Sequence, residues 1–401
     1  MPATAPAPVN PNVLVWARQE AGYSVPDLVA KRLNVKPERL ISWERGERQP
    51  SLRQAKELAR VYHRPFGVFF LASPPNVRPL ASEYRRLPGI EPGVESPELR
   101  LAIRVMSLRR DAALDLGNQL GIEAEDAKIT ARLDESPTLV GQRLRKVLGI
   151  TPQQQFDWQN EWQAWKEWRT AVEAAGILVF QFPKVPLEEA RGISLLEFPL
   201  SVIGINSKEM SPAARSYSLL HELVHIALAR AQQEKPASEE KRTDEEWQSL
   251  ERFAEETASA ILIPEEELTL ILERFVRPAP EWTVDAVRTL ARRFRITPLA
   301  MATRLRARGD MNWPEYARWK LKWADYVASL PPRKGGFSTP IGKTLGRSGE
   351  PFVKLVISAL DANRVTAYDA SRLLDLGFGH FDKLREALRP HPGGALREST
   401  E

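Results

Sequence analysis

The 401-residue chain contains no cysteine and only 5 histidines. The lack of cysteine excludes disulfide bonds, thiol nucleophiles and cysteine-ligated metals. Any metal site must therefore use these few imidazoles together with Asp and Glu side chains. No apolar run approaches the roughly 20 residues that span a bilayer, and the first residues have neither the basic start nor the apolar stretch of a signal peptide. We expect a cytoplasmic protein with no membrane association.

A strong excess of one charge is also missing, because 57 Lys and Arg stand against 52 Asp and Glu, a formal net charge of +5. Residues 1–75 hold 11 basic and 6 acidic side chains, so this stretch carries the whole excess. A local basic excess is a mild indication of an anionic partner. The hydrophobic content of 43% is ordinary for a globular protein.

Composition divides the chain into five parts. We expect a flexible N-terminus (1–9), an all-helical unit (10–72), a mixed region (83–310), a helical extension (311–390) and a loose tail (391–401), with a Pro-rich linker at 72–82. Within the mixed region, "ILVFQF" (177–182) and "SVIGIN" (201–206) have the length and β-branching of strands. The predicted fold class is mainly α, with a small α+β domain in the middle and an all-α domain at the N-terminus.

The N-terminal unit reads as a series of short helices. Ser24 and Asp27 resemble a capping box for a helix that runs through Leu33, and Ser51 with Gln54 forms another. Between them, "NVK" makes a short turn, and "PERLISWER" follows as a second helix closed by a glycine. Two short helices joined by a three-residue turn are typical of DNA-binding helix-turn-helix units.

The second of these helices is expected to turn Leu40 and Trp43 toward the core. Its outward face then offers side chains for phosphates and base edges. These candidates are Lys36, Arg39, Ser42, Arg45 and Arg48. Because acidic Glu38 and Glu44 share this helix, a role in protein contacts stays open. Residues 18–65 resemble the lambda-repressor/Cro-like (XRE-type) helix-turn-helix family, which implies DNA binding.

The run "SLLHELVHIALAR" (218–230) carries three polar residues in an otherwise apolar helix. His221 and His225 are four apart, so both imidazoles can point at one metal ion from the same helix face. Glu222 is rotated by about 100° and can reach a water molecule beside that metal without being a ligand. A polar cluster with a purely structural role is less attractive, because buried imidazoles and carboxylates need partners.

A catalytic zinc needs a third protein ligand, and the remaining histidines are distant in sequence. In the next apolar-faced helix, Glu251 falls on one stripe with Ala254, Ala258 and Leu262, so we expect it to be that ligand. Glu255 lies one turn further and is a candidate hydrogen-bond acceptor for a ligating histidine. For Glu255, an exposed helix charge is the alternative.

Two segments, "RGISLLEFPLSVIGINSKEMSPAARSYSLLHELVHIAL" and "ERFAEETASAILIP", together resemble the ImmA/IrrE family of metallopeptidases. This resemblance implies a zincin-like (gluzincin) fold, metal ligands at His221, His225 and Glu251, and a general base at Glu222. Glu255 stands where the family prefers Asn or Asp, and Thr257 where it prefers Phe. The implied cofactor is Zn²⁺, although such donors also accept Mn²⁺ or Co²⁺.

The resemblance further implies a site-specific endopeptidase that cleaves a cognate DNA-binding repressor or antitoxin, and so relieves repression in a stress response. The expected partners are this protein substrate and, through the N-terminal domain, DNA. The alternative is a transcription regulator or antitoxin whose peptidase-like domain is a sensor or binding module without proteolysis. A purely structural zinc would require a fourth ligand, for which we find no candidate.

Overall fold

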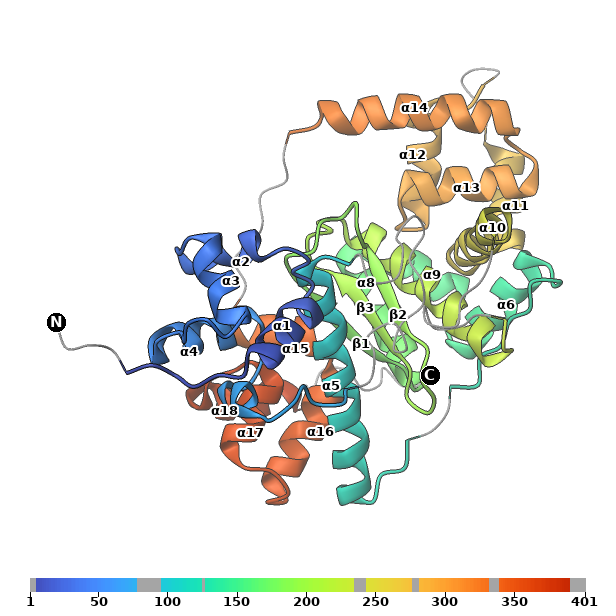
Figure 1. The fold of residues 1–401 in the computed structure, drawn as a ribbon. Coiled ribbons are helices and arrows are strands. Elements are labelled where there is room, and N and C mark those ends of the chain that lie inside the picture. Colours follow the sequence, from blue (N-terminus) through green and yellow to red (C-terminus); the bar gives the residue numbers. More distant parts are fainter. Residues whose placement is uncertain are drawn as a thin grey trace. The chain divides into compact units, whose positions relative to one another are not determined.

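The computed structural model describes residues 5–77, 95–124, 127–233, 243–275, 281–331 and 339–389. Residues 78–82 of the expected linker (72–82), the expected domain start at 83 and the expected tail (391–401) lie outside these residues. The chain forms two compact units, which divide at Val105 within helix α5 (Pro97–Leu120) (Figure 1).

The first unit contains the predicted all-helical domain. Its helices are α1 (Pro11–Glu20), α2 (Pro26–Leu33), α3 (Pro37–Glu44), α4 (Leu52–Val61) and the 3₁₀ helix η1 (Phe66–Phe70). The turn between α2 and α3 is made by Asn34, which has a left-handed backbone with φ of 53°. Leu40 and Trp43 are fully buried, as predicted. This arrangement is a helix-turn-helix.

The capping predictions for this domain had opposite outcomes. Ser51 and Gln54 form the expected capping box of α4. The box predicted at Ser24 is wrong, because α2 begins at Pro26 after an extended Val25 and has no side-chain cap. A residue that precedes proline is sterically kept out of the helical region, and β-branched Val25 therefore cannot begin the helix.

Residues 5–9, expected to belong to a flexible N-terminus, are instead packed on the domain. Ala7 and Val9 are 1% and 2% exposed, and the Ala7 N–H donates to the carbonyl of Pro50 at 2.8 Å. The expectation missed them because a short Ala/Pro-rich segment carries no periodic pattern, whereas burial against the neighbouring core determines its place.

The second unit is built around a three-stranded sheet in the order β1-β3-β2. The predicted strands are confirmed as β1 (Leu178–Phe182) and β3 (Val202–Asn206), which are parallel. Strand β2 (Gly192–Leu195), which was not predicted, pairs antiparallel with β3. It is four residues long and begins with glycine, so its sequence does not show a strand pattern.

Helices cover both faces of this sheet. Strand register places Val179, Ile203 and Ser194 on one face, which packs against α8 (Glu161–Ala174) and α9 (Pro212–Arg230). On the opposite face Phe180 meets Phe352 of α16 (Glu350–Asp361) edge to face, with ring centroids 5.5 Å apart. The C-terminal helices therefore share a core with the sheet.

The remaining elements of this unit are all helical, and the fold is mainly α with a small α+β domain, as predicted. They are α6 (Pro137–Val147), α7 (Pro152–Asp157), α10 (Asp244–Leu262), α11 (Glu265–Arg274), α12 (Val284–Arg293), α13 (Pro298–Arg308), α14 (Trp313–Ser329), α15 (Pro340–Ser348), α17 (Ala367–Leu374), η3 (Phe378–His380) and α18 (Phe381–Leu388). Helix α10 begins at Asp244 behind the capping residue Thr243, whose side chain accepts the N–H of Glu246.

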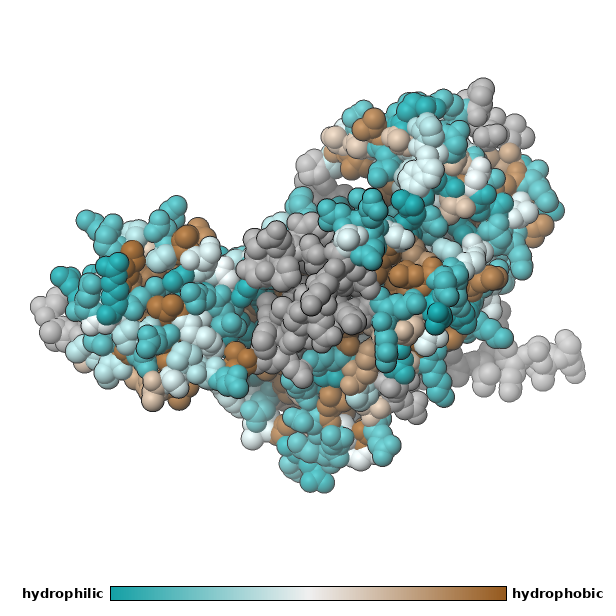
Figure 2. Space-filling view, turned by 45° about the vertical axis from the view of Figure 1, so that its right-hand side comes forward, coloured by the Kyte–Doolittle hydropathy of each residue, from teal (hydrophilic) through white to brown (hydrophobic). Residues whose placement is uncertain are grey.

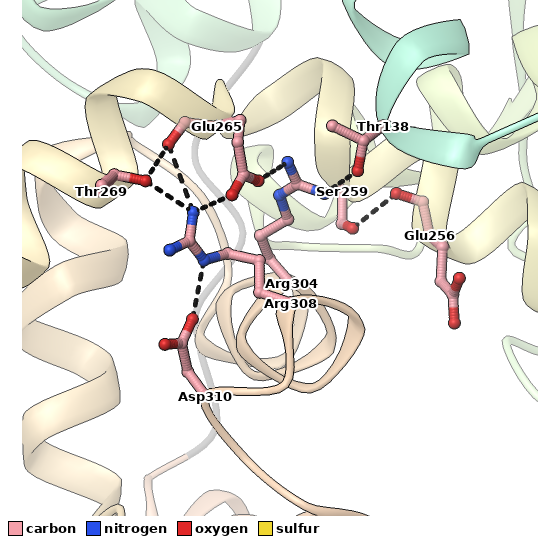
Figure 3. A network of polar contacts seen from close by, with 8 residues as sticks. All are labelled: Thr138, Glu256, Ser259, Glu265, Thr269, Arg304, Arg308 and Asp310. Carbon is pink, nitrogen blue, oxygen red and sulfur yellow. Dashed lines mark hydrogen bonds and ion pairs between the residues drawn. The ribbon is translucent and has the colours of Figure 1, made fainter.

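A polar network around the buried Arg304 ties α13 to its neighbours (Figure 3). Arg304, only 1% exposed, donates to Glu265 on α11 at 2.5 Å and to Thr138 on α6 at 3.0 Å. Arg308, one turn further along α13, binds the same Glu265 and also Asp310. A buried guanidinium that lost these partners would leave an unpaired charge, so this network holds the helices around α10 in place.

Among the described residues, no helix is long and apolar enough to cross a membrane. The face drawn in Figure 2 shows hydrophobic residues scattered among hydrophilic ones.

Candidate metal centre

Helix α9 supplies the central part of the site. Ser211 caps its start by accepting the N–H of Ala214 at 3.2 Å, and Pro212 occupies its first turn. Almost every side chain from Leu219 to Ala229 is buried, because the helix lies between the sheet and α8 and α10. The core packing therefore fixes the direction of the polar side chains on this helix.

The two histidines of α9 converge as their spacing predicts. Their Nε2 atoms lie 3.0 Å apart, and their ring centroids are separated by 4.7 Å. The side chain of His225 is completely buried, while that of His221 is 14% exposed. One side of the pair can thus be reached from solvent.

Glu251 on α10 joins the pair from the neighbouring helix. Its carboxylate oxygens lie 3.2 Å from Nε2 of His221 and 3.7 Å from Nε2 of His225. One ligand atom from each of the three residues lies within 4.8 Å of the others. Small buried residues, Ala254 and Ala258, let α10 approach the core on this stripe.

These separations fit one tetrahedral ion. Two ligands that are each about 2.05 Å from zinc in tetrahedral geometry are about 3.3 Å from each other, and the pairs here are separated by 3.0, 3.2 and 3.7 Å. Two neutral imidazoles and one carboxylate also form the donor set of an open catalytic site. The group can hold a divalent metal, which when bound would lower the pKa of a water molecule to about 7.

Glu222 is held by β2, a contact that the sequence analysis missed. Its side chain is 3% exposed, and the hydroxyl of Ser194 donates to its carboxylate. A Cβ at Gly192 would lie 2.7 Å from both Cγ and Oε1 of Glu222, so any larger residue there would displace this side chain. Alternate residues of a strand share one face, and "GIS" therefore presents Gly192 and Ser194 together to α9. The sequence offered one signal for this contact, namely a glycine and a serine two residues apart in the segment that precedes the predicted strand 201–206.

Tyr217 approaches the site from one turn before His221. Its ring stacks on the imidazole with centroids 6.3 Å apart and an interplanar angle of 28°. Burial and then the nearby charge of Glu255 raise the pKa of Tyr217 well above its ordinary value. The phenol therefore stays protonated, and its stacked ring restricts rotation of the His221 side chain.

Glu255 lies on the side of α10 that faces two tyrosines. Its charge raises the pKa of Tyr217 and of Tyr316, after burial as the main cause. The predicted hydrogen bond from a ligating histidine to Glu255 is not among the contacts described, and it stays a prediction. Thr257, where a phenylalanine is typical of the resembled family, is completely buried.

The candidate DNA-binding residues of the first unit lie mostly where expected. Lys36, Arg39, Arg45 and Arg48 are exposed on or beside α3. Ser42 is not: it is 9% exposed, and its hydroxyl donates to the carbonyl of Arg39 at 2.8 Å. Its predicted outward direction is wrong, because a small side chain next to Trp43 is covered by the packed domain.

The acidic residues of α3 differ from each other. Glu44 forms an ion pair with Arg18 at 2.7 Å, and both side chains are only 8% exposed. Glu38 is exposed. One of the two acidic charges that counted against DNA binding is therefore neutralised inside the domain.

The fold and this site together define a protein with a helix-turn-helix domain and a second, α+β domain that carries a His-His-Glu group. Comparison with known families agrees with this class. Residues 172–306 match the family model described as IrrE N-terminal-like domain, and residues 14–69 match that of the helix-turn-helix. The architecture suggested by the resemblance, a peptidase domain of the ImmA/IrrE type with an N-terminal helix-turn-helix, is confirmed. No curated protein and no solved structure matches the chain.

Proposed function

We propose that the protein is a zinc-dependent, site-specific endopeptidase of the gluzincin type, which cleaves a DNA-binding repressor or antitoxin. The observation that carries this proposal is the convergence of His221, His225 and Glu251 beside Glu222. The first three residues would hold Zn²⁺, or Mn²⁺ in its place. A metal held by these residues would polarise the scissile carbonyl and activate water.

Glu222 has the general-base role in this proposal. Its carboxylate, held by Ser194, accepts a proton from the attacking water and delivers it to the leaving amine. The ligand side chains reach solvent, with 14% of His221 and 19% of Glu251 exposed, and a polypeptide substrate would approach from this side. A regulator that only binds metal would have no use for a carboxylate buried at this position.

The N-terminal domain would bring the peptidase to its target. Exposed Arg39, Arg45 and Arg48 would contact DNA, where a DNA-bound regulator is found. We also propose the domain boundaries near residues 72, 83 and 310 that the composition predicts.

The substitution Glu222→Gln tests the mechanism. It preserves shape but removes the base, so we expect cleavage to fall by about 10²- to 10⁴-fold while zinc content stays at the wild-type level. The substrates to test are any small DNA-binding proteins encoded next to this chain, with zinc or a chelator added and the products identified by mass spectrometry. Cleavage by Glu222→Gln at the wild-type rate would contradict the mechanism. Tight zinc binding with no cleavage by the wild type would favour the regulator without proteolysis.

A further inference from the structure

The C-terminal helices repeat the turn geometry of the N-terminal helix-turn-helix at the same spacing. Helix α1 is followed by left-handed residues at Gly22 and Asn34, and α16 by left-handed residues at Asn363 and Asp375. The helix between the two turns has eight residues in both places, α2 in the first unit and α17 in the second. Asn34 and Asp375 have nearly the same backbone, with φ, ψ of 53°, 47° and 49°, 47°.

The backbone hydrogen bonds of the two segments correspond as well. The Tyr23 N–H donates to the Arg18 carbonyl at 3.1 Å, and the Arg364 N–H donates to the Ala359 carbonyl at 2.8 Å. In the same way, Val35 donates to Ala30 at 3.0 Å and Leu376 donates to Ser371 at 3.1 Å. The third pair of bonds runs from the Arg39 N–H to the Lys36 carbonyl and from the His380 N–H to the Gly377 carbonyl, both at 3.0 Å. The two chain segments thus follow one path through both turns.

The apolar positions of the two segments match too. Those of the first segment are Val29, Leu33, Val35, Leu40 and Trp43, which belong to or pack on its core. Their equivalents, all at most 5% exposed, are Ala370, Leu374, Leu376, Phe381 and Leu384. The C-terminal unit differs in that its last helix begins with a 3₁₀ turn, η3, and that α16 packs on the sheet through Phe352.

Residues 350–389 hold six basic and six acidic side chains, and among the described residues more of the basic ones lack an ion-pair partner. Most of its carboxylates are engaged locally, namely Glu350 with Lys354, Asp361 and Asp382 with Arg385, Asp375 with Arg347, and Asp369 with the hydroxyl of Thr366. Arg372, Lys383 and Arg389 are exposed and have no carboxylate within 4.0 Å among the described residues. Arg372 and Arg389 occupy the positions of Lys31 and Arg48 in the first segment.

We propose that residues 350–389 form a second helix-turn-helix unit, which binds the phosphate backbone of duplex DNA through Arg372, Lys383 and Arg389. Just before its last helix, the C-terminal segment has Gly377 and Gly379 where the first segment has Lys36 and Glu38. With Gly377 and Glu386 at the positions of Lys36 and Arg45, it offers fewer basic side chains for base edges than the first segment. Phosphate contacts carry no sequence information, so this unit adds affinity while the N-terminal domain selects the site.

The salt dependence of DNA binding by the full chain tests this proposal. We would compare the variant Arg372→Gln/Lys383→Gln/Arg389→Gln with a control of equal charge, Lys128→Gln/Lys146→Gln/Lys166→Gln, whose lysines are exposed elsewhere in the same unit. Each phosphate contact contributes about 0.9 to the slope of log Kd against log salt for a non-specific duplex. The first variant should therefore lose about 2 to 3 from this slope, and the control should keep it. Equal slopes in the two variants would overturn the proposal.

A single labelled residue provides a second measurement that does not depend on a triple variant. The chain has no cysteine, so Lys383→Cys and, as control, Lys166→Cys each carry one fluorophore. Adding the duplex should change the emission at position 383 and leave that at 166 unchanged. If only a protein partner changes the emission at 383, the unit is a protein-docking module and the DNA proposal is wrong.

Discussion

Helices α9 and α3 place their functional side chains in opposite environments. On α9, Glu222 and His225 are buried at 3% and 0% exposure, whereas Arg39, Arg45 and Arg48 on or beside α3 face solvent. A buried polar group is costly unless it has partners, so the polar residues of α9 require a specific set of neighbours. An exposed arginine requires none, and its presence says less about function.

This difference in burial explains why the sequence pattern of α9 allows fewer functional interpretations than the pattern of α3. Because α9 is buried, its polar side chains are compatible with one arrangement, in which three metal-ligating side chains converge beside the carboxylate of Glu222. The exposed face of α3 is compatible with DNA or with a protein. The comparison can be tested at both places, beginning with the largest expected effect.

Removing a ligand from the buried site should have the largest effect. Outer partners of metal ligands already contribute 10- to 100-fold to affinity, so we expect Glu251→Ala to weaken zinc binding by at least about 100-fold. Isothermal titration calorimetry measures this, with Glu245→Ala, an exposed acid on the same helix, as control. Unchanged affinity would mean that Glu251 is not a ligand.

Disturbing the contact between β2 and α9 should separate catalysis from metal binding. In Gly192→Ala the added Cβ would be 2.7 Å from Cγ of Glu222, so this side chain must move. We expect cleavage to fall by about 100-fold or more with zinc affinity within twofold of wild type. Ser194→Ala should lower kcat less and leave KM unchanged.

The matched control for Ser194→Ala is Ser216→Ala. Ser216 is equally buried, lies on α9 and donates to the carbonyl of Pro212 at 3.1 Å, away from the carboxylate. If both serine variants lose the same activity, the contact with Glu222 has no particular role.

In the helix-turn-helix domain, the buried ion pair should matter more for stability than any exposed charge. Glu44→Gln leaves Arg18 buried without its charged partner, and we expect a loss of about 3 kcal/mol in local stability. Hydrogen exchange of the amides in α1 to α3 reports this value. Glu47→Gln, whose side chain is 58% exposed, should change it little. A small loss of local stability in both variants would show that burial of the ion pair has no particular importance for stability.

Exposed residues of the same domain should show the smallest stability effects. Arg39→Ala should weaken binding to the cognate operator by about tenfold and change stability by less than about 0.5 kcal/mol. Ser42→Ala is the informative partner, because its buried hydroxyl donates to the Arg39 carbonyl. It should leave operator affinity nearly unchanged in a fluorescence anisotropy titration. A larger loss in Ser42→Ala than in Arg39→Ala would reverse the assignment of the DNA-facing surface.

Local patterns predicted much of the fold. The helix of the His-Glu-x-x-His run, the turn at Asn34, the capping box at Ser51 and both longer strands follow from neighbouring residues. The failures also have local causes. Val25 could not be helical before proline, and the four residues of β2 are too few to show alternation.

The sequence alone determined the spacing that lets His221 and His225 face one point, because a helix turns by about 100° per residue whatever surrounds it. Tertiary structure decided what lies opposite that point. Glu251 belongs to a separate helix, and the contacts of Gly192 and Ser194 with Glu222 result from the packing of β2 on α9. The correspondence of the C-terminal turns with the helix-turn-helix was likewise visible only in three dimensions, because backbone angles and buried positions can repeat while the side chains differ.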